Sequence, residues 1–157
     1  MAATREQILN ALCLAYNMEL ETVTNYLSNS INLDGVRADF VKQALAADIQ
    51  GELMHAQQLG NRIKQLGGTV PGSLALKMTQ KSLQPLEDTT DVVDVIRGVL
   101  EAEEAAINHY RAIIKLTDGE DYVTQDLAIK LLSDEEGHRQ QFQGYLKEYT
   151  LVAARQH

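Results

Sequence analysis

The sequence predicts an all-α fold, a four-helix bundle in which two antiparallel helical hairpins are joined by a long crossover. Only two prolines occur among 157 residues, Pro71 and Pro85, and both fall in one middle stretch. Elsewhere the chain is rich in Ala, Leu, Gln, Glu and Lys, all of which favour helices. Gly, Asn and Asp clusters divide the chain into four long helical segments, as expected for a single domain over residues 1–157.

Turn and capping residues mark the ends of these segments. The Asn-Leu-Asp-Gly sequence of residues 32–35 ends the first, and Gly67 with Gly68 is a common C-terminal signal for the second. Asp and Thr at 88–91 supply N-cap side chains for the third, and the sequence Asp-Gly-Glu-Asp at 118–121 precedes the fourth. The expected helices cover about residues 4–31, 36–66, 88–117 and 121–154.

The lengths of the connections predict how the helices are arranged. The first and third connections are a few residues long, so each joins two antiparallel neighbours. The middle connection, residues 67–87, reaches about 70 Å when extended. Helices of this size are about 42–51 Å long, so the middle connection can span the bundle. A short helix at about residues 74–83 is an alternative to an entirely irregular crossover.

Composition excludes several classes of protein. With 14 Lys+Arg against 22 Asp+Glu, the net charge is −8, which argues against a nucleic-acid partner. Apolar runs are too short for a transmembrane helix, so no membrane partner is expected. The first residues do not resemble a signal peptide, which favours a cytoplasmic location. The single cysteine, Cys13, excludes a disulfide framework and any four-cysteine metal site.

Each predicted helix carries ionisable residues at mid-length on an otherwise apolar face. Steps of three and four along the chain trace these faces. The first and third helices each place one glutamate there, while the second and fourth each place a Glu-x-x-His pair. These six residues are Glu19, Glu52, His55, Glu103, Glu135 and His138.

Four buried glutamates need compensation, because a buried carboxylate costs several kcal/mol when nothing balances its charge. No Lys or Arg lies on the predicted inner faces, so ion pairs cannot supply it. Two divalent cations would compensate the charge of the four carboxylates. Each Glu-x-x-His pair offers an oxygen and a nitrogen from one helical face, and this donor set suits iron or manganese.

Other ionisable residues fall outside this set. Glu21 and Glu101 lie about 200° around their helices from Glu19 and Glu103 and are expected to face water. Glu104 and Glu136 are assigned to the solvated surface, and His109 and His157 are not expected to be ligands. Asp134 is expected to orient a histidine through its second ring nitrogen. Tyr26 is either a hydroxyl beside the centre or a core residue.

Residues 18–26 (MELETVTNY), 52–56 (ELMHA) and 121–138, ending in SDEEGH, resemble the bacterioferritin branch of the ferritin-like superfamily. The resemblance covers nearly the whole chain and implies a ferroxidase centre with two iron ions per subunit. It implies that Glu52 and Glu135 bridge the irons, with Glu19 and His55 on one iron and Glu103 and His138 on the other. It also implies oxidation of Fe(II) by dioxygen or hydrogen peroxide, and iron storage and detoxification in a homo-oligomeric cage.

The chain departs from that family at three points. Leu53 stands where haem-binding members carry Met, so haem is not expected. Gly51 stands where the family tends to place an acidic partner. The 19 residues after His138 are few for the fifth helix of a 24-subunit cage. A 12-subunit Dps-like cage, a 24-subunit cage and a simple dimer all stay open, and neither end has a Lys-rich tail for DNA.

Two rival functions remain open from the sequence. One is a di-iron or di-manganese peroxidase or catalase on the same bundle, without mineral storage. A rubrerythrin-like form of it would need a four-cysteine module, which a single cysteine excludes. The other is a metal-free helical interaction module, which six inward ligands disfavour.

Overall fold

The computed structural model confirms the all-α four-helix bundle. Within residues 3–154, which the structure describes, the chain forms four α-helices, a single short 3-10 turn at Ser73–Ala75, and no strand. The helices are α1 (Arg5–Asn32), α2 (Asp39–Gln65), α3 (Val92–Thr117) and α4 (Tyr122–Ala154).

Two helices begin later than predicted. The third begins after Asp91, because this aspartate accepts a hydrogen bond from the amide of Asp94 at 3.0 Å and caps the helix. Asp88 instead binds the amide and hydroxyl of Thr90 and closes a turn. The second helix begins at Asp39, since residues 36–38 complete a turn that Gly35 opens with φ of +93°.

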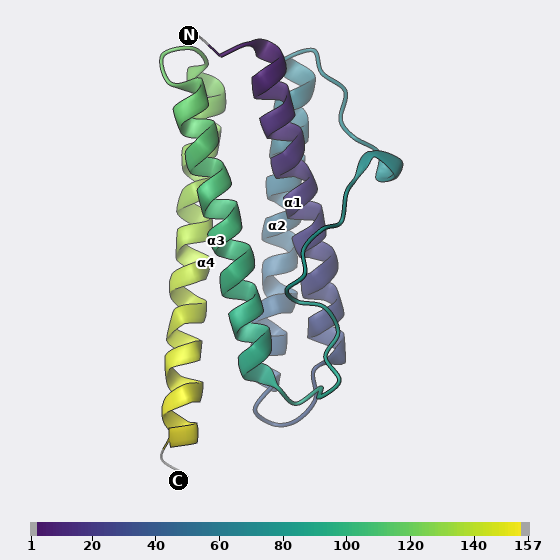
Figure 1. Ribbon diagram of the computed structural model, residues 1–157, viewed down its shortest axis with the longest axis vertical. Helices are drawn as coiled ribbons and strands as arrows, with labels where there is room; N and C mark the ends of the chain where they lie inside the picture. Colours follow the sequence, from purple (N-terminus) through teal and green to yellow (C-terminus); the bar gives the residue numbers. More distant parts are fainter. Residues whose placement is uncertain (1–2, 155–157) are drawn as a thin grey trace.

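The helices pair in the predicted order (Figure 1). The first pair, α1 and α2, forms one antiparallel hairpin, and α3 with α4 forms the other; packing within each pair is more extensive than between them. Residues 66–91 cross from the end of α2 to the start of α3 and run beside α1 over part of the bundle length (Figure 1). This crossover makes α2 and α3 parallel.

A row of polar side chains on α1 holds the crossover. We call it the polar ladder: Asn17, Glu21, Asn25 and Asn29. Its first member binds the carbonyl and the amide of Lys77, at 2.9 and 2.6 Å. Its second accepts a bond from the amide of Gln80 at 2.5 Å, and its last donates to the carbonyl of Leu83 at 2.6 Å.

The polar ladder explains why the helix considered for residues 74–83 does not form. Backbone groups of Lys77, Gln80 and Leu83 bind side chains of α1 rather than one another. Only the turn at Ser73–Ala75 is helical in that region. A repeat of four residues on α1 thus fixes an extended segment about sixty positions later in the chain.

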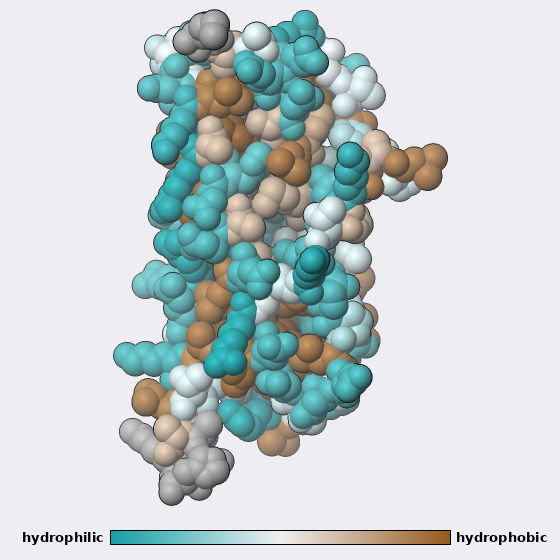
Figure 2. Space-filling model, in the orientation of Figure 1, coloured by the Kyte–Doolittle hydropathy of each residue, from teal (hydrophilic) through white to brown (hydrophobic). Residues whose placement is uncertain are grey.

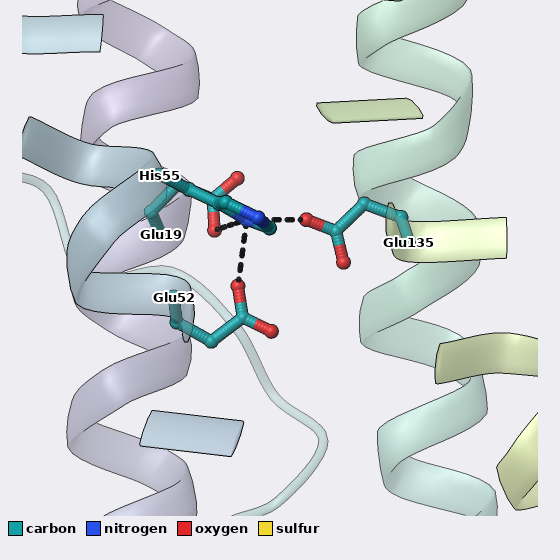
Figure 3. A group of neighbouring side chains, drawn as sticks. All are labelled: Glu19, Glu52, His55 and Glu135. Carbon is teal, nitrogen blue, oxygen red and sulfur yellow. Dashed lines mark ion pairs between the residues drawn. The ribbon is translucent and has the colours of Figure 1, made fainter. Parts of the chain in front are cut away.

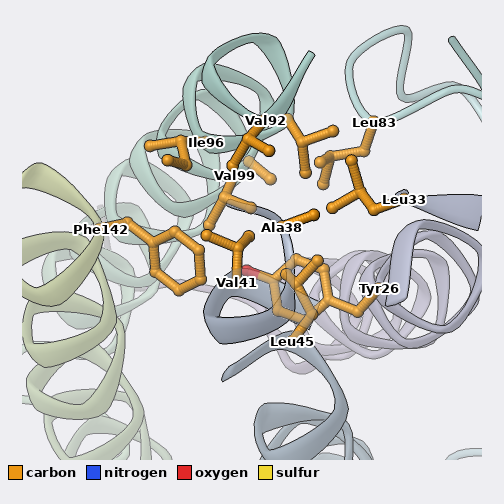
Figure 4. Close-up of a cluster of buried hydrophobic side chains, with 12 residues drawn as sticks. Tyr26, Leu33, Ala38, Val41, Leu45, Leu83, Val92, Ile96, Val99 and Phe142 are labelled. Carbon is orange, nitrogen blue, oxygen red and sulfur yellow. The ribbon is translucent and has the colours of Figure 1, made fainter. Parts of the chain in front are cut away.

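Apolar side chains form two clusters separated along the bundle axis. One lies toward the α1–α2 loop (Figure 4) and includes Tyr26, Leu33, Val41, Leu45, Ile96, Val99 and Phe142. The other lies toward the start of α1 and includes Ile8, Leu12, Leu59, Ile63, Tyr110, Ile113 and Leu131. The predicted ionisable residues occupy the layer between these clusters, so apolar side chains flank them on both sides along the bundle axis.

The surface in view is largely polar, with scattered hydrophobic patches (Figure 2). In the described part of the chain, no helix combines the length and the apolar character needed to traverse a bilayer.

Candidate metal centre

All six predicted residues meet in the middle layer of the bundle. Each helix contributes from mid-length, where the three- and four-residue steps of its apolar face bring an ionisable side chain inward. The four glutamates are between 1% and 3% exposed, and His55 is 4% exposed. His138 is partly exposed, with 21% of its side chain accessible.

The first group gathers around His55 (Figure 3). Nδ1 of His55 lies 3.1 Å from Oε1 of Glu135 on α4 and 3.4 Å from Oε2 of Glu52 on α2. It also lies 3.6 Å from Oε2 of Glu19 on α1. Potential ligand atoms of these four residues all lie within 4.8 Å of one another, which is close enough to surround one cation.

The second group gathers around His138 and shares two glutamates with the first. Nδ1 of His138 lies 3.3 Å from Oε1 of Glu52, 3.3 Å from Oε2 of Glu135 and 3.8 Å from Oε1 of Glu103. Glu52 and Glu135 thus turn one oxygen toward each histidine. The two rings are stacked with centroids 6.5 Å apart, so the groups are adjacent.

Several potential metal-ligand atoms of the two groups make no hydrogen bond. Glu52 Oε1, Glu135 Oε1 and Glu103 Oε2 are buried without a hydrogen-bond partner, as is Nδ1 of both histidines. Their N···O contacts, between 3.1 and 3.8 Å long, are not hydrogen bonds. Buried polar atoms are nearly always paired, so this convergence of unpaired donors fits two divalent cations.

Glu19 and Glu103, which we call the outer glutamates, each accept a hydrogen bond from a tyrosine of the opposite hairpin. The hydroxyl of Tyr26 on α1 donates to Oε1 of Glu103 on α3 at 2.5 Å. The hydroxyl of Tyr110 on α3 donates to Oε1 of Glu19 on α1. Tyr26 is therefore both core and part of the centre. Sequence reasoning assigned no role to Tyr110, although a tyrosine follows each outer glutamate by seven residues.

The expected orienting acid is in place for one histidine. Oδ2 of Asp134 lies 3.2 Å from Nε2 of His55, the ring nitrogen that faces away from the group. A carboxylate in that position fixes the tautomer and orientation of a metal-binding imidazole.

The other ionisable residues lie apart from this group, and one of them, Glu21, is not where the sequence predicted. The prediction that Glu21 faces water is wrong: it is 7% exposed, because its carboxylate binds the crossover at Gln80. Glu101 and Glu104 are exposed, and Glu136 forms a surface ion pair with Arg111. His109 bonds to the carbonyl of Ala11 at 2.8 Å, away from the centre. His157 lies outside the described residues.

The cluster balances its charges with protons. Burial raises the pKa of Glu19 well above its usual value, and burial with the charge of Glu135 raises the pKa of Glu103 to about 10. Contacts with Glu135 and Glu52 raise the pKa of His138 to about 11. Glu103 is thus neutral at pH 7 and His138 is a cation, while the pKa of Glu19 is shifted in the same direction as that of Glu103.

The other three residues carry charge. Burial opposes ionisation of Glu52 and of Glu135, but contacts with the two histidines outweigh it and lower both pKa values. Burial disfavours a charged His55, yet contacts with Glu135 and Glu19 outweigh it and raise its pKa. Two histidine cations therefore face the carboxylates of Glu52 and Glu135, and divalent cations would take the place of the protons.

A cavity of about 420 Å³ connects the centre to the surface between α1, α3 and the crossover. Its inner wall includes all four glutamates of the centre. The exposed Glu101 on α3 and Lys81 on the crossover lie at its outer wall, together with Glu21 on α1 and Gln80 on the crossover. The cavity gives small molecules and ions a route to the carboxylates.

Comparison with known proteins agrees with this architecture. Residues 9–152 match the Ferritin family, described as a ferritin-like domain. The DNA protection during starvation protein of Pyrococcus furiosus is 28% identical over 145 residues, which cover 90% of this chain and 77% of that protein.

Solved structures show the same fold. A dodecameric thioferritin, the bacterioferritin-related protein of Bacteroides fragilis, aligns with a TM-score of 0.88 at 23% identity, covering 98% of this chain and 92% of that one. A ferritin-like di-iron-carboxylate protein of Bacillus anthracis aligns with a TM-score of 0.77 at 20% identity, covering 93% and 99%. Because the family match spans residues 9–152, the chain belongs to the ferritin-like family, as the sequence resemblance predicted.

Proposed function

We propose that this protein is a ferroxidase that binds Fe(II) at the mid-bundle centre and oxidises it with dioxygen or hydrogen peroxide. One observation carries the proposal: Glu52 and Glu135 each turn one oxygen toward His55 and the other toward His138. Two carboxylates shared in this way suit a pair of ions rather than one. The family match and the relatives support an iron-related role.

The six side chains would divide between two Fe(II) ions. Glu52 and Glu135 would bridge them, Glu19 and His55 would complete one position, and Glu103 and His138 the other. Two Fe(II) together supply two electrons, which with two protons convert dioxygen to hydrogen peroxide. The chain's part is to hold the ions side by side and to leave positions open for the oxidant.

The cavity between α1, α3 and the crossover would admit both the ions and the oxidant. It reaches the glutamates directly, and the exposed Glu101 stands at its outer wall. With Glu21 it gives this wall two carboxylates against the one ammonium group of Lys81, and a net negative charge raises the local concentration of cations. The polar ladder keeps the crossover against α1 and so holds this opening in one shape.

Iron storage and detoxification in a homo-oligomeric cage complete the proposal. The thioferritin with the same fold is dodecameric, and this favours a 12-subunit cage over a 24-subunit cage. Sedimentation velocity of the purified protein separates these assemblies from a dimer.

The direct test is aerobic oxidation of Fe(II), followed by near-ultraviolet absorbance, in the wild type and in Glu135→Gln. Loss of the bridging carboxylate is expected to abolish rapid oxidation. Glu136→Gln is the matched control, because it changes the neighbouring carboxylate on the solvent side and should oxidise at the wild-type rate. Equal rates in wild type and Glu135→Gln would contradict the proposal.

A di-iron or di-manganese peroxidase or catalase is the second candidate, since carboxylate and imidazole donors also suit manganese. The number of irons taken up separates the two. Storage requires uptake well beyond two ions per chain in a large assembly. Uptake that stops at two per chain, together with rapid consumption of hydrogen peroxide, supports the second candidate.

A further inference from the structure

The two Glu-x-x-His helices differ at one position that matters for their histidines. On α4, Asp134 precedes Glu135; on α2, Gly51 precedes Glu52. The helices are otherwise related, since each turns its glutamate toward both groups and its histidine toward one. A residue just before the glutamate on one helix therefore faces the histidine of the other, as Asp134 does at His55.

The two histidines are consequently held to different degrees. His55 has Nδ1 directed into its group and Nε2 at 3.2 Å from Asp134, and its side chain is 6% exposed. For His138, whose side chain is 21% exposed, no protein group in the described part of the chain binds Nε2. Its ring is positioned through Nδ1, which contacts Glu52, Glu135 and Glu103, and not through Nε2.

The nearest alternative acid does not make up the difference. Asp48 lies one turn before Glu52 on α2, and the charge of His138 reaches it. It forms no hydrogen bond with His138, however, and its Oδ2 is buried without a partner. A Cβ atom at Gly51 would meet nothing within 4 Å, so this position has room for a side chain.

We propose that the two metal positions are intrinsically unequal: the position of Glu19 and His55 binds a divalent cation more tightly than that of Glu103 and His138. The cause is the single carboxylate that orients His55 and has no counterpart at His138. Loss of such a partner typically lowers metal affinity by about 10- to 100-fold. The inference rests on the proposed metal centre and adds an order of filling to it.

The inequality gives the centre one resident position and one exchanging position. The ion beside His55 fills first and leaves last, while the ion beside His138 exchanges with the solution. The geometry thus assigns different affinities to two sets of ligands that have the same composition.

Anaerobic titration with Co(II), followed by calorimetry, tests the inference without any activity. Two ions that share carboxylates repel each other, so two separated binding steps alone prove nothing. The variants Gly51→Asp and Asp134→Gly distinguish unequal from equal positions, because the two cases predict opposite changes in the separation of the two binding steps. Gly51→Ala is the control for the added Cβ and for helix propensity.

If the positions are unequal as proposed, Gly51→Asp strengthens the weaker step about 10-fold and brings the two steps together. Asp134→Gly weakens the tighter step about 10-fold and also brings them together. If the positions were equal, either variant would move the steps apart. Steps that move apart, stay as they are, or move as far in Gly51→Ala would overturn the inference.

Failure of the proposed function has a separate signature. Binding of fewer than two Co(II) per chain by the wild type, or two undiminished steps in Glu135→Gln, would refute the metal centre itself. Circular dichroism of each metal-free variant shows whether its helices are intact, so that a misfolded chain is not scored as weak binding.

Discussion

The hydroxyl of Tyr26 donates a 2.5 Å hydrogen bond to Glu103 across the bundle, from the first hairpin to the second. The hydroxyl of Tyr110 on the second hairpin donates the equivalent hydrogen bond to Glu19 on the first. Each outer glutamate is thus held by the hairpin to which it does not belong. The pair ties α1 to α3 at the level of the candidate metal centre, where apolar packing is interrupted.

We expect Tyr26→Phe to destabilise the metal-free protein by about 1–3 kcal/mol, the usual cost of leaving a buried polar group without its partner. Glu103 already has one unpaired buried oxygen, and the variant leaves both unpaired. Urea denaturation measures the change. Tyr16→Phe on the same helix removes a hydroxyl that makes none of the centre's bonds and should change stability little; an equal loss in both variants would contradict the role of Tyr26.

Metal loading should release protons. At neutral pH, Glu103, His55 and His138 each hold a proton that a cation must displace, because their pKa values lie above 7. We expect release of about three protons or more as two Co(II) bind, and affinity that rises with pH. An indicator dye in weakly buffered solution measures the release. Glu136→Gln should release the same number; release of fewer than two protons by the wild type would refute the assignment.

Glycine at 98 is expected to be needed for packing rather than for flexibility. A Cβ atom there would lie 3.1 Å from the amide nitrogen of Leu83, which the polar ladder holds in a left-handed conformation with φ of +62°. Gly98→Ala should therefore cost about 1–3 kcal/mol through overpacking.

Gly51→Ala is the matched comparison for this effect, because it lies at mid-helix in open space. It should instead stabilise the protein by about 0.5–1 kcal/mol through helix propensity. Thermal unfolding of both variants measures the difference. Equal stabilisation by the two substitutions would show that the crossover yields to the added methyl group.

Asp121 should stabilise the start of α4 in two ways. Its carboxylate accepts a bond from the amide of Thr124 at 3.0 Å and forms a 2.7 Å ion pair with Arg62 on α2. We expect Asp121→Ala to cost about 2 kcal/mol at pH 7. Asp121→Asn keeps a capping oxygen and loses the ion pair, so it should cost less. Urea denaturation of the three proteins gives this order, and equal costs for both variants would contradict it.

The contribution of Asp121 also predicts a pH dependence. Burial opposes its ionisation, but bonds from Thr124 and Arg62 outweigh this and lower its pKa below the usual 3.8. A lowered pKa in the folded state stabilises the protein above pH 3.8, and that stabilisation is lost as the pH falls through the folded-state value. The difference between wild type and Asp121→Ala should therefore shrink below about pH 4.

Some features were accessible to sequence analysis because they are local. Steps of three and four residues identify a helix face, and a charged residue on that face stands out, as Glu103 does between Val99 and Ile107. The prediction failed for Glu21. Helix geometry shows that its side chain points away from the bundle interior, but not whether that side of the helix meets water or another segment. The carboxylate faces a third surface, the crossover, whose path no local pattern specifies.

The sequence by itself determined the four helices, their order and the six inward ionisable residues, since each depends on neighbours within a turn or two of one helix. The resemblance also implied that Glu52 and Glu135 are shared, and an orienting role for Asp134 was expected. Tertiary structure alone decided which oxygen of each shared glutamate faces which histidine, that Asp134 contacts His55 rather than His138, and the exchange of tyrosine bonds between hairpins. These depend on the register between helices distant in the chain. Apolar packing on either side of the middle layer sets that register to a fraction of a helical turn.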